Sequence, residues 1–189
     1  MTENAQTTVR IAESLDNREM DELCDATASA VEDGGGFGWL TPPPRQVMET
    51  YYSGVVLVPG RTLFLGLLDG MIAGSAQLLA PTRNNEAQAA ACNLVSAFVA
   101  PWARGHGLAR TLTEAVEKQA RQEGFGMINL DVRESQAAAI HVYESMDYVQ
   151  WGAHPLYARL ADGTIVPGRF YYKVLIGEAP EAAGAEQGE

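Results

Sequence analysis

The chain has 189 residues, 47% of them hydrophobic, and a formal net charge of −11. This length suits one compact domain, which we place at residues 1–176, followed by an acidic disordered tail at 177–189. The acidic balance argues against a nucleic-acid partner, because phosphate binding requires a basic face. No apolar run is long enough to span a membrane and no secretory signal is visible, so we expect a cytoplasmic protein without a membrane partner. Two cysteines and three histidines without metal-ligand spacing predict reduced, buried thiols and no metal site.

Periodicity and turn signals predict seven strands and four helices in a single unit. The expected strands are 7–13, 61–69, 71–80, 89–99, 127–132, 148–157 and 169–176, and the expected helices are 16–31, 41–53, 107–123 and 136–145. Asp16 and Glu19 form a capping signal, and Asp69-Gly70 and Asp162-Gly163 indicate hairpins. Hairpins mixed with helical crossovers predict an α/β (α+β) domain, in which a mixed sheet carries helices on both faces.

The stretch 96–110 reads as a buried strand, a proline turn, a glycine-rich loop and a helix start. Gly105 and Gly107 lack a Cβ, so their backbone N–H groups can approach a ligand closely. The helix that follows adds unpaired donors and the positive end of its dipole, and Arg104 and Arg110 flank the loop. These features suit a pyrophosphate.

Two common nucleotide loops do not match this stretch. A P-loop needs Gly-Lys-Ser/Thr, whereas Gly107 is followed by Leu108-Ala109-Arg110. A Rossmann fingerprint needs a small residue at position 110, which is arginine. The pattern that remains is Arg-x-x-Gly-x-Gly/Ala, met by Arg104, Gly107 and Ala109, and it resembles the acetyl-CoA loop of the GCN5-related N-acetyltransferases (GNAT).

Further segments carry the same resemblance over nearly all of residues 7–176. Ala139-Ile140-His141-Val142-Tyr143-Glu144 is similar to the Ala-Ile-x-Leu-Tyr segment of the helix that follows the motif in this family. Gly-Gly-Gly-Phe-Gly-Trp-Leu at 34–40 and the C-terminal strands at 155–173 resemble the tabtoxin-resistance acetyltransferases. The implied structure is a GNAT fold with about seven strands, splayed between the fourth and fifth.

The resemblance implies acetyl-CoA as co-substrate and no metal. The pantetheine arm would pair with the backbone near Phe98 and Val99 at a break in strand pairing before Pro101, and the pyrophosphate would take donors from 104–109. The full set implied in acetyl-CoA binding is Phe98, Val99, Arg104, Gly105, His106, Gly107, Leu108, Ala109, Arg110, Gln136 and Tyr143.

Direct acetyl transfer requires loss of an amine proton, stabilisation of an oxyanion and protonation of the leaving thiolate. The resemblance implies Tyr143 as the acid, since a phenol of pKa about 10 stays protonated at neutral pH. Asp131 is either the base, the group that binds the ammonium, or a strand-end carboxylate paired with Arg133. Phe37 and Trp39, together with Asp131, are the expected acceptor-binding residues.

These features predict an N-acetyltransferase acting on a primary amine of a small molecule, such as an amino-acid-like or toxin amine. Two alternatives stay open: an enzyme that acetylates a protein N-terminus or a lysine, and a CoA-binding sensor that has lost catalysis. The resemblance also allows a homodimer.

Overall fold

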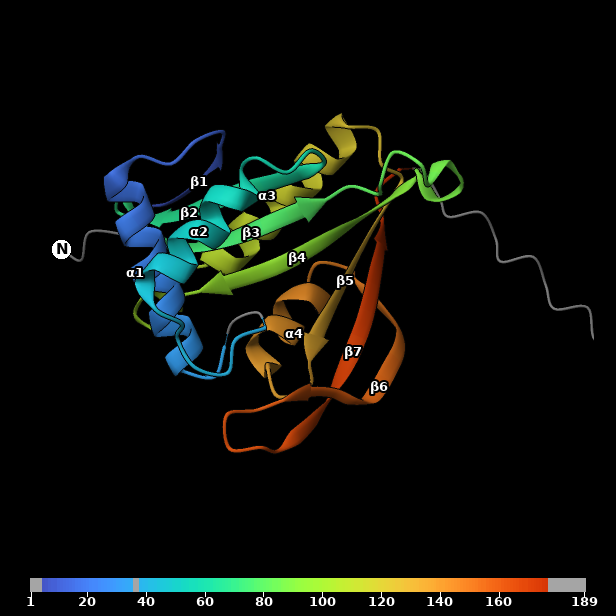
Figure 1. Cartoon of the computed structure of the whole chain (residues 1–189). Coiled ribbons are helices and arrows are strands. Elements are labelled where there is room, and N and C mark those ends of the chain that lie inside the picture. Colours follow the sequence, from blue (N-terminus) through green and yellow to red (C-terminus); the bar gives the residue numbers. More distant parts are fainter. Residues whose placement is uncertain (1–4, 36–37, 177–189) are drawn as a thin grey trace, which may run out of the picture.

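The computed structural model describes residues 5–35 and 38–176, and its element order is the predicted one (Figure 1). Within these residues one sheet contains β1 (Thr7–Ala12), β2 (Arg61–Leu68), β3 (Met71–Leu79), β4 (Ala91–Val99), β5 (Met127–Arg133), β6 (Val149–Arg159) and β7 (Ile165–Val174). The helices are α1 (Asn17–Glu32), α2 (Arg45–Val55), α3 (Leu108–Gln122) and α4 (Ala137–Glu144), with short 3-10 turns η1 (Glu86–Gln88) and η2 (Pro101–Ala103). The expected acidic tail at 177–189 lies outside the described residues.

The strand order is β1-β2-β3-β4-β5-β7-β6, and the β4–β5 pair is parallel while the others are antiparallel. β4 and β5 pair over only three positions, Ala91–Asn93 with Met127–Asn129, and then diverge (Figure 1). This divergence confirms the splay expected between the fourth and fifth strands. It leaves a wedge between the carboxyl ends of two parallel strands, the place where ligands bind in open α/β sheets.

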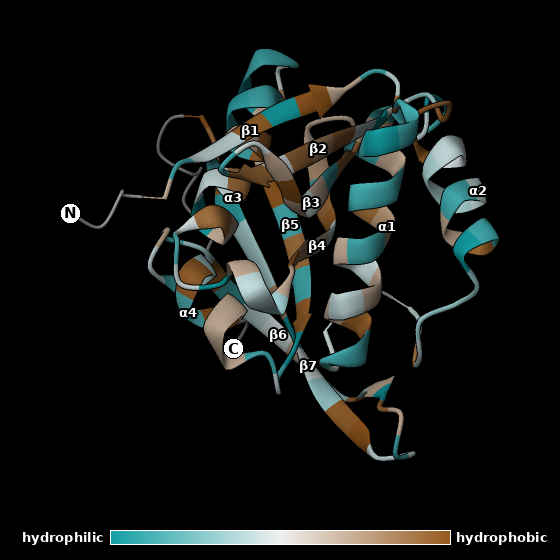
Figure 2. Ribbon diagram, turned by 90° about the vertical axis from the view of Figure 1, so that its left-hand side faces the viewer, coloured by the Kyte–Doolittle hydropathy of each residue, from teal (hydrophilic) through white to brown (hydrophobic). Residues whose placement is uncertain are grey.

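Helices cover both faces of the sheet, as predicted, with α1 and α2 on one side and α3 and α4 on the other (Figure 2). On the α3 side, Leu112 and Val116 share a core with Ile128 and Leu130 of β5. Each such fully buried side chain contributes roughly 1.5–3 kcal/mol. Within the described residues, no helix has both the length and the apolar character needed to cross a membrane.

Local signals at α1 and at the first hairpin have the predicted structure. Glu19 N donates to Asp16 Oδ1 at 2.8 Å and Asp16 N donates to Glu19 Oε2 at 3.1 Å, so the capping box is complete. Such a cap is worth about 1 kcal/mol. Asp69 and Gly70 both have positive φ, at 50° and 84°, which is the mirror-image turn that joins twisted strands.

Two predicted boundaries were wrong, both near prolines. α2 begins at Arg45 and not within 41–44, and Pro44 precedes it with a ψ of 143°. A residue before proline is disfavoured in the helical region, so positions 41–43 are held out of the helix. β7 begins at Ile165 and not at Arg169, although it contains Pro167. This proline is tolerated because it lies opposite a bulge in β6, where a ladder donor is not needed.

Candidate functional site

A β-bulge interrupts β4 where it leaves β5. Two residues of β4, Ser96 and Ala97, oppose Ala76 of β3 alone. Ser96 has a φ of 53°, in the left-handed region that serine rarely adopts. A bulge bends its strand and ends regular pairing, so this one helps turn β4 away from β5. It lies directly before Phe98 and Val99, where the sequence predicts a break in pairing.

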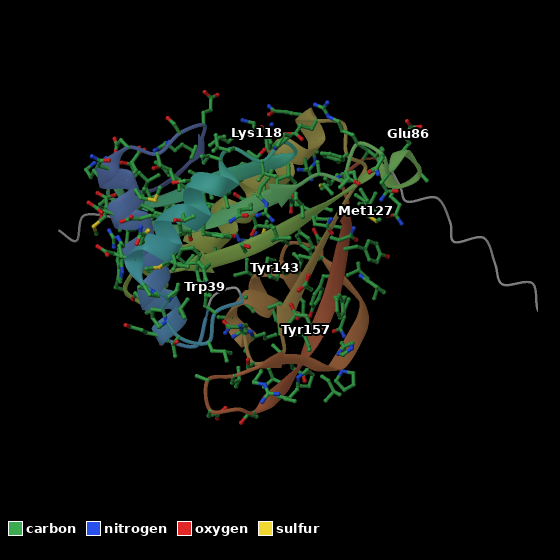
Figure 3. All side chains as sticks on the ribbon, viewed as in Figure 1. Trp39, Glu86, Lys118, Met127, Tyr143 and Tyr157 are labelled. Atoms are coloured by element: carbon green, nitrogen blue, oxygen red, sulfur yellow. The ribbon has the colours of Figure 1, made fainter. Side chains whose placement is uncertain are left out.

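A cavity of about 580 Å³ lies beyond this bulge. Its walls come from β4, β5, α4, the end of β6 and the loop before α2, namely Gly38, Leu40, Leu94, Val95, Ser96, Ala97, Asp131, Val132, Arg133, Gln136, Ala139, Tyr143, Tyr157, Ala158 and Arg159. The fold thus brings both predicted catalytic residues, Asp131 and Tyr143, to one cavity. Figure 3 shows Tyr143 and Tyr157 in the C-terminal half of the molecule, with Trp39 across from them.

Tyr143 reaches the cavity from the last turn of α4 and is only 8% exposed. Its ring makes an edge contact with the ring of Tyr148, with centroids 5.6 Å apart. Burial, followed by the negative charge of Asp131, raises the pKa of Tyr143 to about 12. The phenol therefore keeps its proton throughout the neutral range.

Asp131 accepts a hydrogen bond from the hydroxyl of Tyr157. No ion pair joins Asp131 to Arg133 among the described residues, which differs from the pairing that the sequence left open. Burial, the hydrogen bond and the charge of Asp131 all raise the pKa of Tyr157, while Arg133 lowers it. Tyr157 lines the cavity and contacts a predicted catalytic residue, but sequence reasoning did not assign it to the site.

A bulge in β6 places Tyr157 at the cavity. Residues 155–157 oppose position 167 of β7 alone, because the register shifts between His154 and Ala158. The ring of Tyr157 then lies on Gly168 of β7, where an added Cβ would be 2.1 Å from Tyr157 Cγ. Pro155 within a strand and Gly168, which is opposite His154, are the sequence signals that could have revealed this contact.

The contact between Gly168 and Tyr157 gives a stability prediction. Gly168→Ala should destabilise the fold by about 1–3 kcal/mol, because the new methyl group overlaps the ring. In a Tyr157→Ala background the same change should cost under about 0.5 kcal/mol, since the overlap is gone. Urea unfolding measures both values. Gly152→Ala in β6 is the control, because a Cβ there meets nothing within 4 Å. An equal cost in both backgrounds would contradict this reading of Gly168.

The glycine loop presents donors to open space. Gly105 and Gly107 have φ of 83° and 80°, and a Cβ on either would meet no protein atom within 4 Å. The hydrogen bonds of α3 begin with Thr111 N donating to Gly107 O at 3.1 Å. In the described part of the chain, no backbone acceptor meets the N–H groups of 105–110, which include Leu108 and Ala109.

The side chains around this loop have protein partners. Arg110 Nη2 donates to Ser145 Oγ at 2.7 Å, and His106 Nδ1 lies 3.0 Å from Arg104 O. Arg104 Nη1 donates to Asp33 Oδ2 at 2.6 Å, an ion pair at the end of α1. The contact from Arg104 connects the glycine loop to the segment that follows α1.

The same segment is also held from β5 and from the residue that precedes α4. Arg133 Nη1 and Gln136 Nε2 both donate to Gly34 O, at 3.2 and 3.3 Å. Arg104 and Gln136, two residues predicted to bind acetyl-CoA, thus hold neighbouring positions of one loop. Gly38 and Leu40, which follow in the chain, line the cavity.

Three other predicted residues, Phe98, Val99 and Trp39, are not part of the cavity wall. Phe98 is buried in the core under α1 and α2, and Val99 packs against the core on the α3 side. Trp39 lies half-buried against Tyr51 of α2, with ring centroids 5.3 Å apart. Phe37 lies outside the described residues.

Known proteins are similar to this chain in sequence and in fold. The model of the Acetyltransferase (GNAT) family matches residues 21–148. An uncharacterized N-acetyltransferase in the hisH–hisA intergenic region of Azospirillum brasilense is 60% identical over 129 residues, which are 68% of this chain and 77% of that protein.

Two solved structures show the extent of the fold similarity. The Salmonella typhimurium protein yncA, solved with its cofactor acetyl-CoA, has a TM-score of 0.73 at 19% identity, over 94% of this chain and 99% of its own. The ribosomal-protein-alanine N-acetyltransferase of Brucella melitensis has a TM-score of 0.73 at 21% identity, over 88% and 99%. At these identities the likeness establishes the shared fold over most of the chain.

Proposed function

Because this chain belongs to the GNAT family of acetyltransferases and takes acetyl-CoA as its co-substrate, we propose that it transfers the acetyl group directly to a primary amine of a small molecule. The observation that carries the proposal is the placement of Asp131 and Tyr143 on one cavity of about 580 Å³. Pockets for small molecules commonly measure roughly 300–1,000 Å³. The loop residues Gly38 and Leu40 wall this cavity, which favours a compact acceptor over an extended peptide.

The residues around the wedge fit acetyl-CoA. The unpaired N–H groups of 105–110, at the start of a 15-residue helix, suit a pyrophosphate. Gly105 and Gly107 leave the space that such a group needs. Arg104, His106 and Arg110 surround the loop, and the backbone near Phe98 and Val99 follows the bulge that would admit the pantetheine arm. Bound there, acetyl-CoA supplies an acyl group already activated as a thioester.

Tyr143 and Asp131 divide the proton chemistry in this proposal. Tyr143 holds a proton at its hydroxyl oxygen and gives it to the leaving sulfur, because its raised pKa keeps the phenol neutral. Asp131 faces the acceptor amine, where it holds the ammonium or takes its proton through water. The hydroxyl of Tyr157 fixes one carboxylate oxygen of Asp131, so the other stays directed to the acceptor.

Release of CoA against a panel of amines tests this function. The panel contains small primary amines, peptides with a free N-terminus and peptides with an internal lysine. A thiol reagent suits the assay, because both cysteines are buried and burial raises the pKa of Cys24 to about 11 and of Cys92 to about 12. We expect turnover with small amines at least tenfold above that with any peptide.

The other outcomes separate the alternatives. Faster turnover with peptides would show a protein acetyltransferase and would contradict the small-molecule proposal. Measurable acetyl-CoA binding without turnover on any member of the panel would favour a sensor. Binding is measured by calorimetry with the same protein preparation, so that inactive protein is recognised.

A further inference from the structure

Two arginines of the cavity wall form no ion pair with a described acidic residue. The chain has 24 acidic and 13 basic residues, and eight of the basic side chains form an ion pair with a described acidic residue. Arg133 and Arg159 do not, although both line the cavity. In a protein of net charge −11, cations left without an acidic partner in one cavity point to an anion that arrives with the ligand.

A hydrogen bond orients the side chain of Arg133, but no described acidic residue neutralises its charge. Its Nη1 donates to Gly34 O at 3.2 Å, which fixes the direction of the half-buried guanidinium, and no acidic side chain in the described part of the chain pairs with it. A guanidinium carries five N–H donors in a planar fork that matches a carboxylate. One carbonyl oxygen uses only a small part of that capacity, so donors remain for a ligand.

The register of the C-terminal strands separates the charges along the cavity. The β7 positions opposite Asp131, Arg133 and Arg159 are 170, 168 and 165. At about 3.3 Å per residue, Arg133 lies roughly 7 Å from Asp131 along the sheet, and Arg159 lies further toward the β6–β7 hairpin. The carboxylate of Asp131 and the two guanidinium groups therefore belong to separate positions along one cavity wall, with the backbone of Arg133 nearer to Asp131 than that of Arg159.

We propose that the acceptor is a small amino acid, whose carboxylate binds Arg133 and Arg159 while its amine faces Asp131 and Tyr143. The inference rests on the proposed function and names the substrate class of the same site. The N-terminus of a peptide has an amide where a free amino acid has its carboxylate, so it makes no use of the two guanidinium groups. The arginines thus select free amino acids over peptides.

Matched acceptors test this selection in the complete enzyme. Each common L-amino acid is compared with its own carboxamide, which differs by one negative charge. Losing a charge-assisted contact costs about ten- to a hundredfold. We expect kcat/KM for the preferred amino acid to exceed that for its amide by this factor.

Arg159 is the arginine to replace, because removing Arg133 would also release Gly34. Arg159→Ala should lower kcat/KM for the amino acid by about ten- to a hundredfold and leave the amide within about twofold. Arg159→Lys should restore part of the preference. Arg83→Ala is the control, because Arg83 is exposed, forms no ion pair with described residues and lies in the turn after β3. Calorimetry with acetyl-CoA should give the wild-type Kd for all these variants.

The assays separate failure of the inference from failure of the function. Amides acetylated as well as or better than amino acids would overturn the inference and leave small-amine acetylation standing. An equal loss on both acceptors in Arg159→Ala, or weaker acetyl-CoA binding, would assign the arginine to another role and also overturn it. Turnover with peptides alone would overturn both proposals. Thermal shifts with CoA and the N-acetylated amino acid give a second readout, in which Arg159→Ala should keep the stabilisation by CoA and lose the further stabilisation by the N-acetylated amino acid.

Discussion

Replacing Tyr143 by phenylalanine is expected to lower kcat by about 10²–10⁴-fold, the range that general-acid catalysis contributes. The Kd for acetyl-CoA should stay within about twofold, because the change removes one oxygen from a ring that is otherwise held by its packing against the α3-side core. Steady-state kinetics gives kcat and calorimetry gives Kd. Wild-type turnover would exclude Tyr143 as the acid.

Tyr148→Phe is the matched control for Tyr143→Phe. The two rings are neighbours, with centroids 5.6 Å apart, but Tyr148 is not part of the cavity wall. The wild-type pH profile adds a second check. An acid must be protonated to act, and burial raises the pKa of Tyr143 to about 12, so this group should cause no loss of kcat between about pH 8 and 10. A fall in that range that disappears in Tyr143→Phe would contradict the raised pKa.

Gly107→Val is the substitution expected to affect acetyl-CoA binding most. Residue 107 has a φ of 80°, and a Cβ there would enter the open space over the N–H groups of 105–110. The valine would therefore stand where the pyrophosphate is proposed to bind. Losing two charge-assisted hydrogen bonds raises Kd by about 10²–10⁴-fold, which calorimetry measures.

A control variant separates this effect from backbone strain. Gly70 in the β2–β3 hairpin has a φ of 84° and equally open surroundings. Both valine variants should lose about 1–3 kcal/mol of unfolding free energy through the strained backbone, and only Gly107→Val should lose acetyl-CoA. Tight acetyl-CoA binding by a folded Gly107→Val protein would refute the pyrophosphate site.

Much of the fold is predictable because its signals are local. The capping box at Asp16 and Glu19 and the Asp69-Gly70 turn depend on residues within one turn of chain, and both have the predicted geometry. The signal of the glycine loop is equally local, because the residue type alone allows the positive φ observed at Gly105 and Gly107. The two wrong boundaries lie next to prolines. At α2, the preference of proline for the first turn of a helix competes with the effect of each next proline on the residue before it. At β7, the usual exclusion of proline from strands competes with strand pairing.

Contacts between distant parts of the chain hold the residues on the proposed acceptor side of the cavity. The sequence therefore predicted fewer of them. The contact between Arg133 and Gly34 joins residues 99 positions apart, and the seat of Tyr157 on Gly168 depends on a register shift between two strands. Arg159 belongs to no recognisable sequence motif. Its proposed role follows from its place in the cavity wall and the absence of an ion pair with the described residues, which only a three-dimensional arrangement can reveal.

The wedge gives this sheet four edges where an unbroken sheet has two. Residues 94–99 of β4 and 130–133 of β5 face it without a partner strand, because the two strands pair only at Ala91–Asn93 and Met127–Asn129. Unpaired strand edges invite pairing with other chains and hence aggregation. Anything that fills the wedge covers both inner edges and, by binding the folded state, also stabilises it. With acetyl-CoA bound in the wedge as we propose, we expect the supply of co-substrate to bear on the solubility of this enzyme as well as on its turnover.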